Sequence, residues 1–252
     1  MTAASVDKWM NHQAIDEWEV MVKKVAAFHH KHDFANKNGH DMGYRIALTV
    51  EELGELSAAI TKGKPIEFAV DFKNSRPDID DIKAKISSKT VAICLISPNN
   101  PTGLVFDETA LKQIVDIANE HDLYLICDEI YDKIICDQEF TGIGKVAGNS
   151  PVIILNGFSK VHLMSGWRIG YIAFNDSPQL DMIRENLPKL ARVRISTNLP
   201  VQHAALESLR GPQDYISEFV SELKNHRDYV IKRLNSMNNI SCSNPNGAFY
   251  AF

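Results

Sequence analysis

Two kinds of hydrophobic pattern divide the chain. In the first 61 residues, apolar side chains recur every three or four positions, as at Ile15, Trp18 and Val22, which is the spacing of an amphipathic helix. The polar stretch KNGHDMG interrupts the pattern, and a second apolar stripe of the same kind follows it. Residues 1–61 are therefore expected to form a helical segment of two helices without strands.

From Pro65 onward, short apolar runs alternate with helix-like segments. This alternation predicts an α/β fold with a mostly parallel sheet and helices on both faces. We expect an α/β domain over residues 62–252. Its expected strands are 66–72, 90–97, 123–127, 152–155 and 168–174, and its expected helices are 77–86 and 107–122, with mostly helical sequence from about 178 to 237.

Composition and charge narrow the classes of function. The net charge of −5 offers no basic surface for nucleic acid or anionic lipid. The first residues lack the apolar stretch that is typical of a signal peptide, and no apolar run approaches the ~18 residues of a membrane-spanning helix. The four cysteines form no C-x-x-C pair and are expected to be reduced, buried thiols. These features predict a cytoplasmic protein with no nucleic-acid or membrane partner.

Polar residues follow three of the predicted strands. Asn100, Asp128 and Lys160 each come shortly after an apolar run, and Tyr131 lies three positions beyond Asp128. Ligands of parallel sheets bind beyond the carboxyl ends of the strands. We therefore expect these four side chains to meet in one crevice.

These residue types suit the chemistry of pyridoxal phosphate. The amine of Lys160 can form a Schiff base with an aldehyde, and the carboxylate of Asp128 can pair with a pyridinium nitrogen. Asn100 and Tyr131 can hydrogen-bond a phenolic oxygen, and Arg168 offers a bidentate fork to a phosphate. Each residue alone also has an ordinary explanation as a solvated lysine, a helix cap, a turn former or a surface ion pair. All of these explanations must hold together to dismiss the site.

The segments SPNNPTG, DEIYDKI and NGFSKVHLMSGWRIGY resemble the class I/II aminotransferases, which have the type I fold of pyridoxal-phosphate enzymes. The resemblance covers about residues 62–252 and implies amino transfer between an amino acid and a 2-oxo acid by a homodimer. It implies that Lys160, Asp128 and Tyr131 are catalytic and that Asn100 and Arg168 also bind the cofactor. Many relatives carry a serine phosphate ligand where this chain has Gly157. A decarboxylase or lyase of the same fold is the alternative, because these residues do not decide which bond breaks.

Members of this family carry further parts on both sides of the matching region. These are an amino-terminal arm, a glycine-containing phosphate turn, an aromatic residue that stacks on the cofactor, and an arginine for the substrate carboxylate. Residues 1–61 match none of the first three, and the sequence ends at Phe252. The resemblance therefore implies weakened cofactor binding, and it gives truncation as a reason why a chain of this extent can be inactive.

The first segment resembles the start of the MazG-like nucleotide pyrophosphohydrolases. Glu51, Glu52 and Glu55 stand on one predicted helical face, where carboxylates can bind Mg²⁺. The resemblance implies Mg²⁺-dependent pyrophosphate release as a function from another class. The E-x-x-D motif of the second helix is missing, because Glu67 and Asp71 have the wrong spacing. A solvated acidic helix face is the alternative explanation.

A magnesium titration tests the metal-binding capacity of the first segment. Because the second pair of carboxylates is missing, we expect isothermal calorimetry to detect no tight Mg²⁺ site. A tight site that disappears in Glu52→Ala would show that the first segment is a functional metal centre.

Overall fold

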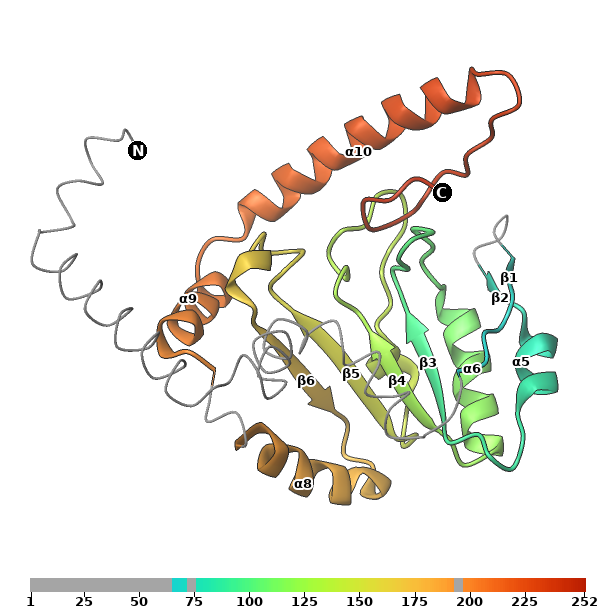
Figure 1. The fold of residues 1–252 in the computed structure, drawn as a ribbon, viewed down its shortest axis with the longest axis vertical. Helices are drawn as coiled ribbons and strands as arrows, with labels where there is room; N and C mark the ends of the chain where they lie inside the picture. The colour runs from blue at the N-terminus through green and yellow to red at the C-terminus, as the bar shows by residue number, and fades with distance from the viewer. Residues whose placement is uncertain (1–64, 72–75, 193–196) are drawn as a thin grey trace, which may run out of the picture. The chain divides into compact units, whose positions relative to one another are not determined.

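The computed structural model describes residues 65–71, 76–192 and 197–252 (Figure 1). These residues belong to one structural unit that extends over residues 57–252. The two helices predicted within residues 1–61, the resemblance to MazG-like enzymes and the candidate ligands Glu51, Glu52 and Glu55 lie outside the described residues. They stay predictions.

The centre of the described chain is a four-stranded sheet in the order β3-β4-β5-β6. β3, β4 and β5 run parallel, and β6 is antiparallel to β5. Their sequences are rich in isoleucine, leucine and valine, which suits strands in a buried sheet. The predicted α/β fold with a mostly parallel sheet is confirmed. The strands are β3 (Ala92–Ile96), β4 (Tyr124–Asp128), β5 (Val152–Gly157) and β6 (Gly170–Phe174).

Three helices, α5 (Ile79–Lys85), α6 (Glu108–Glu120) and α7 (Ile143–Val146), pack with the sheet. An aspartate caps each of the first two: Asp78 accepts the amide of Asp81, and Asp107 accepts the amide of Ala110. Such caps satisfy amides that have no partner inside the helix. The helix starts near 77 and 107 follow from this local chemistry.

The main hydrophobic core lies between α6 and one face of the sheet. Ile114 of α6 and Leu125 of β4 are fully buried in it, and α5 and α7 contribute further apolar side chains. Cys127 points into this core, whereas Cys94 is exposed. The expectation that the cysteines are buried is therefore correct for Cys127 and wrong for Cys94, because neighbouring strands place these residues on opposite faces.

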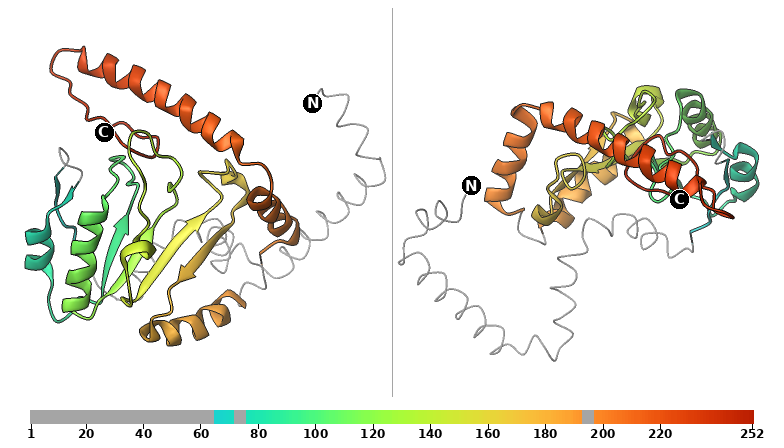
Figure 2. Two further views of the ribbon diagram at one scale, coloured as in Figure 1. Left: turned by 180° about the vertical axis from the view of Figure 1, so that it is seen from behind. Right: turned by 90° about the horizontal axis from the view of Figure 1, so that it is seen from above.

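The sequence between residues 178 and 237 is mostly helical, as predicted. α5 and α6 lie at the β3 side of the sheet and α8 and α9 lie toward the β6 side (Figure 1, Figure 2). None of the helices in the described ranges is long and apolar enough to cross a membrane. The elements are the short 3₁₀ turns η1 (Ser165–Trp167) and η2 (Pro178–Leu180) and the helices α8 (Asp181–Arg192), α9 (Leu199–Arg210) and α10 (Asp214–Asn235).

The strand predicted for residues 66–72 is wrong in extent and in place. The structure has only β1 (Val70–Asp71), which pairs with β2 (Arg76–Pro77) in a separate antiparallel ribbon. The backbone before β1 bonds to α5 and its cap instead. The amide of Ala69 donates to Asp81 at 2.7 Å, and its carbonyl accepts the amide of Asp78 at 2.9 Å. These bonds to the helix occupy the groups that a longer strand would use.

Glu129, directly after β4, ties the centre of the sheet to the start of α7. Its side chain is 9% exposed, and its Oε1 accepts the amide of Ile143 at 2.7 Å. Burial raises the pKa of this carboxyl to about 7, although the Ile143 amide opposes the rise. The negative charges of Asp132 and Asp128 raise the pKa further. At neutral pH the buried cap is therefore partly protonated.

The raised pKa of Glu129 makes stability depend on pH with a defined sign. Between the ordinary pKa of 4.5 and the folded-state pKa of about 7, the folded protein binds a proton that the unfolded chain releases. Stability therefore falls as pH rises through this window. Glu129→Gln keeps an acceptor for Ile143 and removes the titration, so the wild-type free energy of unfolding should decline relative to this variant over that window. Urea unfolding at a series of pH values measures the free energy of unfolding of both proteins. A difference between the wild type and the variant that is constant with pH would contradict the raised pKa of Glu129.

Candidate functional site

The carboxyl ends of β3, β4 and β5 lead into three loops at one edge of the sheet. The parallel register aligns Ile96, Asp128 and Leu155 across the three strands. Asp128 is therefore the last residue of a strand that has neighbours on both sides. The amide of Ser97 donates to its carbonyl at 3.1 Å, which holds the start of the first loop beside it. This geometry is the one expected for a ligand site in an α/β sheet.

The loop after β3 contains the SPNNPTG segment and is a closed turn. Asn99 organises it, because its Oδ1 accepts the amide of Thr102 at 3.2 Å and the hydroxyl of Thr102 at 2.7 Å. Gly103 has a φ of +69°, and a Cβ there would lie 2.3 Å from a side-chain carbon of Pro245. Asn100 is exposed to solvent. The turn therefore depends on Asn99 and Gly103, and the predicted role of Asn100 toward a cofactor stays a prediction.

Asp128 is a half-buried carboxyl with a local hydrogen bond. Its Oδ1 accepts the amide of Ile130 at 3.0 Å. Burial raises the pKa of Asp128, and the Ile130 amide and the positive charge of Lys160 oppose the rise. The structure thus brings Lys160 within electrostatic reach of Asp128. A buried carboxylate of this kind favours a cationic ligand, whose charge would keep it ionised.

Tyr131 and Lys160 lie close to each other in the loops that follow β4 and β5. Tyr131 is 2% exposed, and the Nζ of Lys160 lies 5.7 Å from the centre of its ring. The same nitrogen lies 5.8 Å from the ring centre of Phe249. Both distances fall within the range of a cation–π contact. The structure therefore brings Lys160, Tyr131 and Asp128, three of the four predicted side chains, into one neighbourhood, whereas the convergence of Asn100 with them stays a prediction.

The loop after β5 holds Lys160 and ends near Arg168. Gly157 begins it in close contact with β6, because a Cβ there would lie 2.9 Å from the Cα of Gly170. In this backbone the position that carries a serine in many relatives has no room for a side chain. Arg168 is exposed, has a φ of +53°, and donates from Nη1 to the carbonyl of Ser165 at 2.9 Å. Its predicted contact with a phosphate stays a prediction.

Three further residues of the site received no role from the sequence. Phe249 packs edge-to-face on Tyr131 with ring centres 5.3 Å apart, and the hydroxyl of Tyr250 lies 2.5 Å from that of Tyr131. Ser159 is buried, and its Oγ has no hydrogen-bond partner within the described ranges. In the sequence, the aromatic pair in GAFYAF and the serine before Lys160 are only weak indications of a ligand site. Only the folded chain shows that they reach the site.

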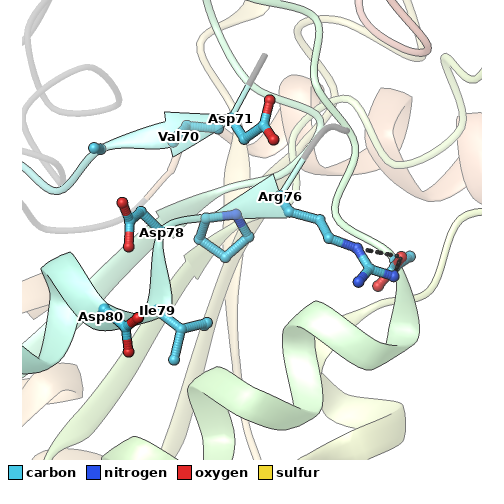
Figure 3. A pocket seen from close by; sticks show the side chains of 9 residues that line it. Val70, Asp71, Arg76, Asp78, Ile79 and Asp80 are labelled. Carbon is cyan, nitrogen blue, oxygen red and sulfur yellow. Dashed lines mark hydrogen bonds and ion pairs between the residues drawn. The ribbon is translucent and has the colours of Figure 1, made fainter. Parts of the chain in front are cut away.

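A separate hollow of about 690 Å³ lies between the β1–β2 ribbon, the start of α5 and Asp107 (Figure 3). Its wall includes Asp71, Asp78 and Asp80. Arg76 spans part of it and pairs with Asp107 at 2.7 Å. No group of histidine, cysteine and acidic side chains that could hold a metal occurs among the residues that the structure describes. Of these acidic residues, Asp78 caps α5, and Asp107 caps α6 and pairs with Arg76.

The comparisons with known proteins agree with the three motifs. A family model described as "Aminotransferase class I and II" matches residues 56–252. The chain is 37% identical over 202 residues to a glutamate-pyruvate aminotransferase of Escherichia coli, which covers 78% of this chain and 50% of the relative. It is 36% identical over 202 residues to an alanine aminotransferase of Mycobacterium tuberculosis, with 78% and 47% covered.

Solved structures show the same relationship. An alanine aminotransferase from Pyrococcus furiosus superposes with a TM-score of 0.73 at 44% identity, over 75% of this chain and 49% of that chain. An aminotransferase from Escherichia coli gives a TM-score of 0.70 at 38% identity, over 74% and 47% of the two chains. The chain thus spans about half the length of these relatives. Since the family model covers most of this sequence, the chain belongs to the class I and II aminotransferase family.

Proposed function

We propose that residues 56–252 bind pyridoxal phosphate and use Lys160, Asp128 and Tyr131 in the transfer of an amino group between an amino acid and a 2-oxo acid. Membership of the family implies pyridoxal phosphate as cofactor and these two substrate classes. The observation that supports the proposal most strongly is the position of the Lys160 amine, which lies 5.7 Å from the ring centre of Tyr131 and whose charge acts on the half-buried carboxyl of Asp128. The carboxylate of Asp128 suits a pyridinium nitrogen, and the amine of Lys160 suits an aldehyde.

The polar groups around Lys160 fit this cofactor. The buried Oγ of Ser159 has no partner within the described part of the chain, although buried hydroxyls normally find one. The carboxylate of Asp128 accepts the Ile130 amide, and a carboxylate has about four acceptor positions. Both groups thus have capacity for a polar ligand. Asp128 ends β4, and Ser159 lies in the loop after the neighbouring strand β5.

Each residue has a distinct part in the proposed chemistry. Pyridoxal phosphate, when bound, supplies an aldehyde and an electron-accepting ring. Asp128 would keep the ring nitrogen protonated, and Tyr131 would donate to the phenolic oxygen. Lys160 would hold the cofactor at its aldehyde carbon with loss of water. Once the amino group of the substrate takes its place, the amine of Lys160 would carry a proton between the substrate Cα and that carbon. Asn100 and Arg168 would add contacts to the phenolic oxygen and the phosphate.

Alanine and glutamate are the first amino donors to consider. The relatives described above include a glutamate-pyruvate aminotransferase and two alanine aminotransferases. The described residues do not include an assigned clamp for the substrate carboxylate. Alanine and glutamate are therefore proposed on the basis of the relatives. A homodimeric assembly is proposed on the basis of the family.

Reductive trapping tests the role of Lys160 directly. We expect borohydride to fix pyridoxal phosphate on the peptide that contains Lys160, as mapped by mass spectrometry at a series of cofactor concentrations. Lys160→Arg should remove this label completely. Asp128→Ala should raise the half-saturating cofactor concentration by about tenfold or more, because a hydrogen bond to a charged group contributes about 1.5–3 kcal/mol.

Lys133→Arg provides the matched control, because Lys133 is an exposed lysine of the neighbouring loop. It should leave the label on Lys160 unchanged. A label spread evenly over surface lysines would contradict the proposal. Any 2-oxo acid formed from alanine or glutamate should depend on Lys160, whereas release of carbon dioxide in its place would favour a decarboxylase of the same fold.

A further inference from the structure

Two tyrosines from distant parts of the chain share a hydroxyl contact beside Lys160. The Oη atoms of Tyr131 and Tyr250 are 2.5 Å apart, although 119 positions separate the residues. Their rings meet edge-to-face at 5.8 Å between centres. Tyr131 is almost completely buried. Its hydroxyl is therefore held by one specific protein partner.

The backbone around Tyr250 fixes its position. The amide of Ala248 donates to the carbonyl of Ile134 at 2.9 Å, and the amide of Gly247 donates to Gly103 at 2.9 Å. These bonds attach the carboxyl-terminal segment to the loops after β4 and β3. Arg227 of α10 donates to the carbonyl of Pro245 at 2.9 Å. Its guanidinium lies 2.5 Å from the carboxylate of Asp137, in the loop after β4.

A hydroxyl pair can be arranged in two ways. In each contact one phenol donates its proton and the other accepts it, and each phenol has a single proton to donate. If Tyr250 donates to Tyr131, the proton of Tyr131 is available to a ligand beside Lys160. If Tyr131 donates to Tyr250, Tyr131 can only accept from that ligand. An anionic oxygen in the site selects the first arrangement, because it requires a donor.

The surroundings of Tyr131 favour its neutral, donating form. Burial raises the pKa of Tyr131, and the negative charge of Asp128 raises it further. A chain of hydrogen bonds also polarises its members, so a donor behind Tyr131 strengthens the bond that Tyr131 makes in front. The phenol therefore acts as a proton donor at neutral pH.

We propose that Tyr250 is a positioning residue that directs the hydroxyl proton of Tyr131 toward the phenolic oxygen of pyridoxal phosphate. Tyr250 acts through Tyr131. This inference rests on the proposed function, since that function supplies the oxygen toward which Tyr131 points. It gives a role to a second residue of the carboxyl-terminal segment, next to Phe249, beside the three loops at the sheet edge.

The pH titration of the bound-cofactor absorbance reports the proton shared between the Lys160 nitrogen and the phenolic oxygen. A donor to that oxygen stabilises its negative charge and thereby weakens its hold on the shared proton. Tyr250→Phe keeps the ring and removes the hydroxyl, so the titration midpoint should move upward by as much as about one pH unit, the equivalent of one neutral hydrogen bond. Tyr131→Phe should move the midpoint further in the same direction.

A double-variant cycle separates positioning from a direct effect. If Tyr250 acts through Tyr131, the variant carrying both Tyr131→Phe and Tyr250→Phe should titrate like Tyr131→Phe alone. Tyr229→Phe removes an exposed hydroxyl from α10 and should leave the midpoint unchanged. Urea unfolding of each protein checks that the folded state is retained. A variant that does not fold is replaced by Tyr250→Trp, which keeps a large aromatic ring without the hydroxyl and should shift the midpoint likewise.

The outcomes distinguish this inference from the proposed function. Failure of the wild-type protein to fix cofactor on Lys160 would overturn both. Cofactor fixed on Lys160 with an unchanged midpoint in Tyr250→Phe would overturn the role of Tyr250 alone. A shift of equal size in the Tyr131→Phe background would also overturn it, because Tyr250 would then act without Tyr131.

Discussion

The parallel register of β3, β4 and β5 is the constraint on which the candidate site depends. It aligns Ile96, Asp128 and Leu155 across three strands, so the loops that follow must leave from the same edge of the sheet. A slip of one residue in β4 would turn Asp128 to the opposite face and remove it from Lys160. The buried face of α6 opposes such a slip, because Leu125 and Cys127 fill the core beneath it. The packing of the core thus fixes the register of β4. This register places the charged side chain of Asp128 outside the core.

Three buried or half-buried acids lie close together at the end of β4. Burial raises the pKa of Asp128, of Glu129 and of Asp132, and the neighbouring negative charges add to the rise at Glu129. Each group is at least partly compensated: Asp128 by the Ile130 amide and Lys160, Glu129 by the Ile143 amide, and Asp132 by the side chain of Asn156 and the charge of Lys133. A cationic ring nitrogen would add to the compensation at Asp128. Perturbed carboxyl groups cluster at functional sites for this reason.

Local sequence patterns predicted most of the sheet and the principal helices, because strands of continuous apolar residues and capped amphipathic helices are encoded in short segments. The patterns failed where a distant contact decides the structure. Residues 66–69 look like part of a strand, but their backbone bonds to α5 and its cap. Tyr250 meets Tyr131 only because α10 returns the carboxyl-terminal segment across the loops after β3 and β4 (Figure 1). No spacing in the sequence could indicate that contact.

The central claim is that Asp128 and Lys160 form the two ends of one pyridoxal-phosphate site. Nitrogen-15 magnetic resonance of cofactor labelled at the ring nitrogen, bound to the protein at neutral pH, tests it most directly. We expect a protonated ring nitrogen in the wild-type protein and an unprotonated one in Asp128→Asn, with the cofactor still attached to Lys160 in both. A ring nitrogen with the same protonation state in the two proteins would contradict the pairing of Asp128 with that nitrogen.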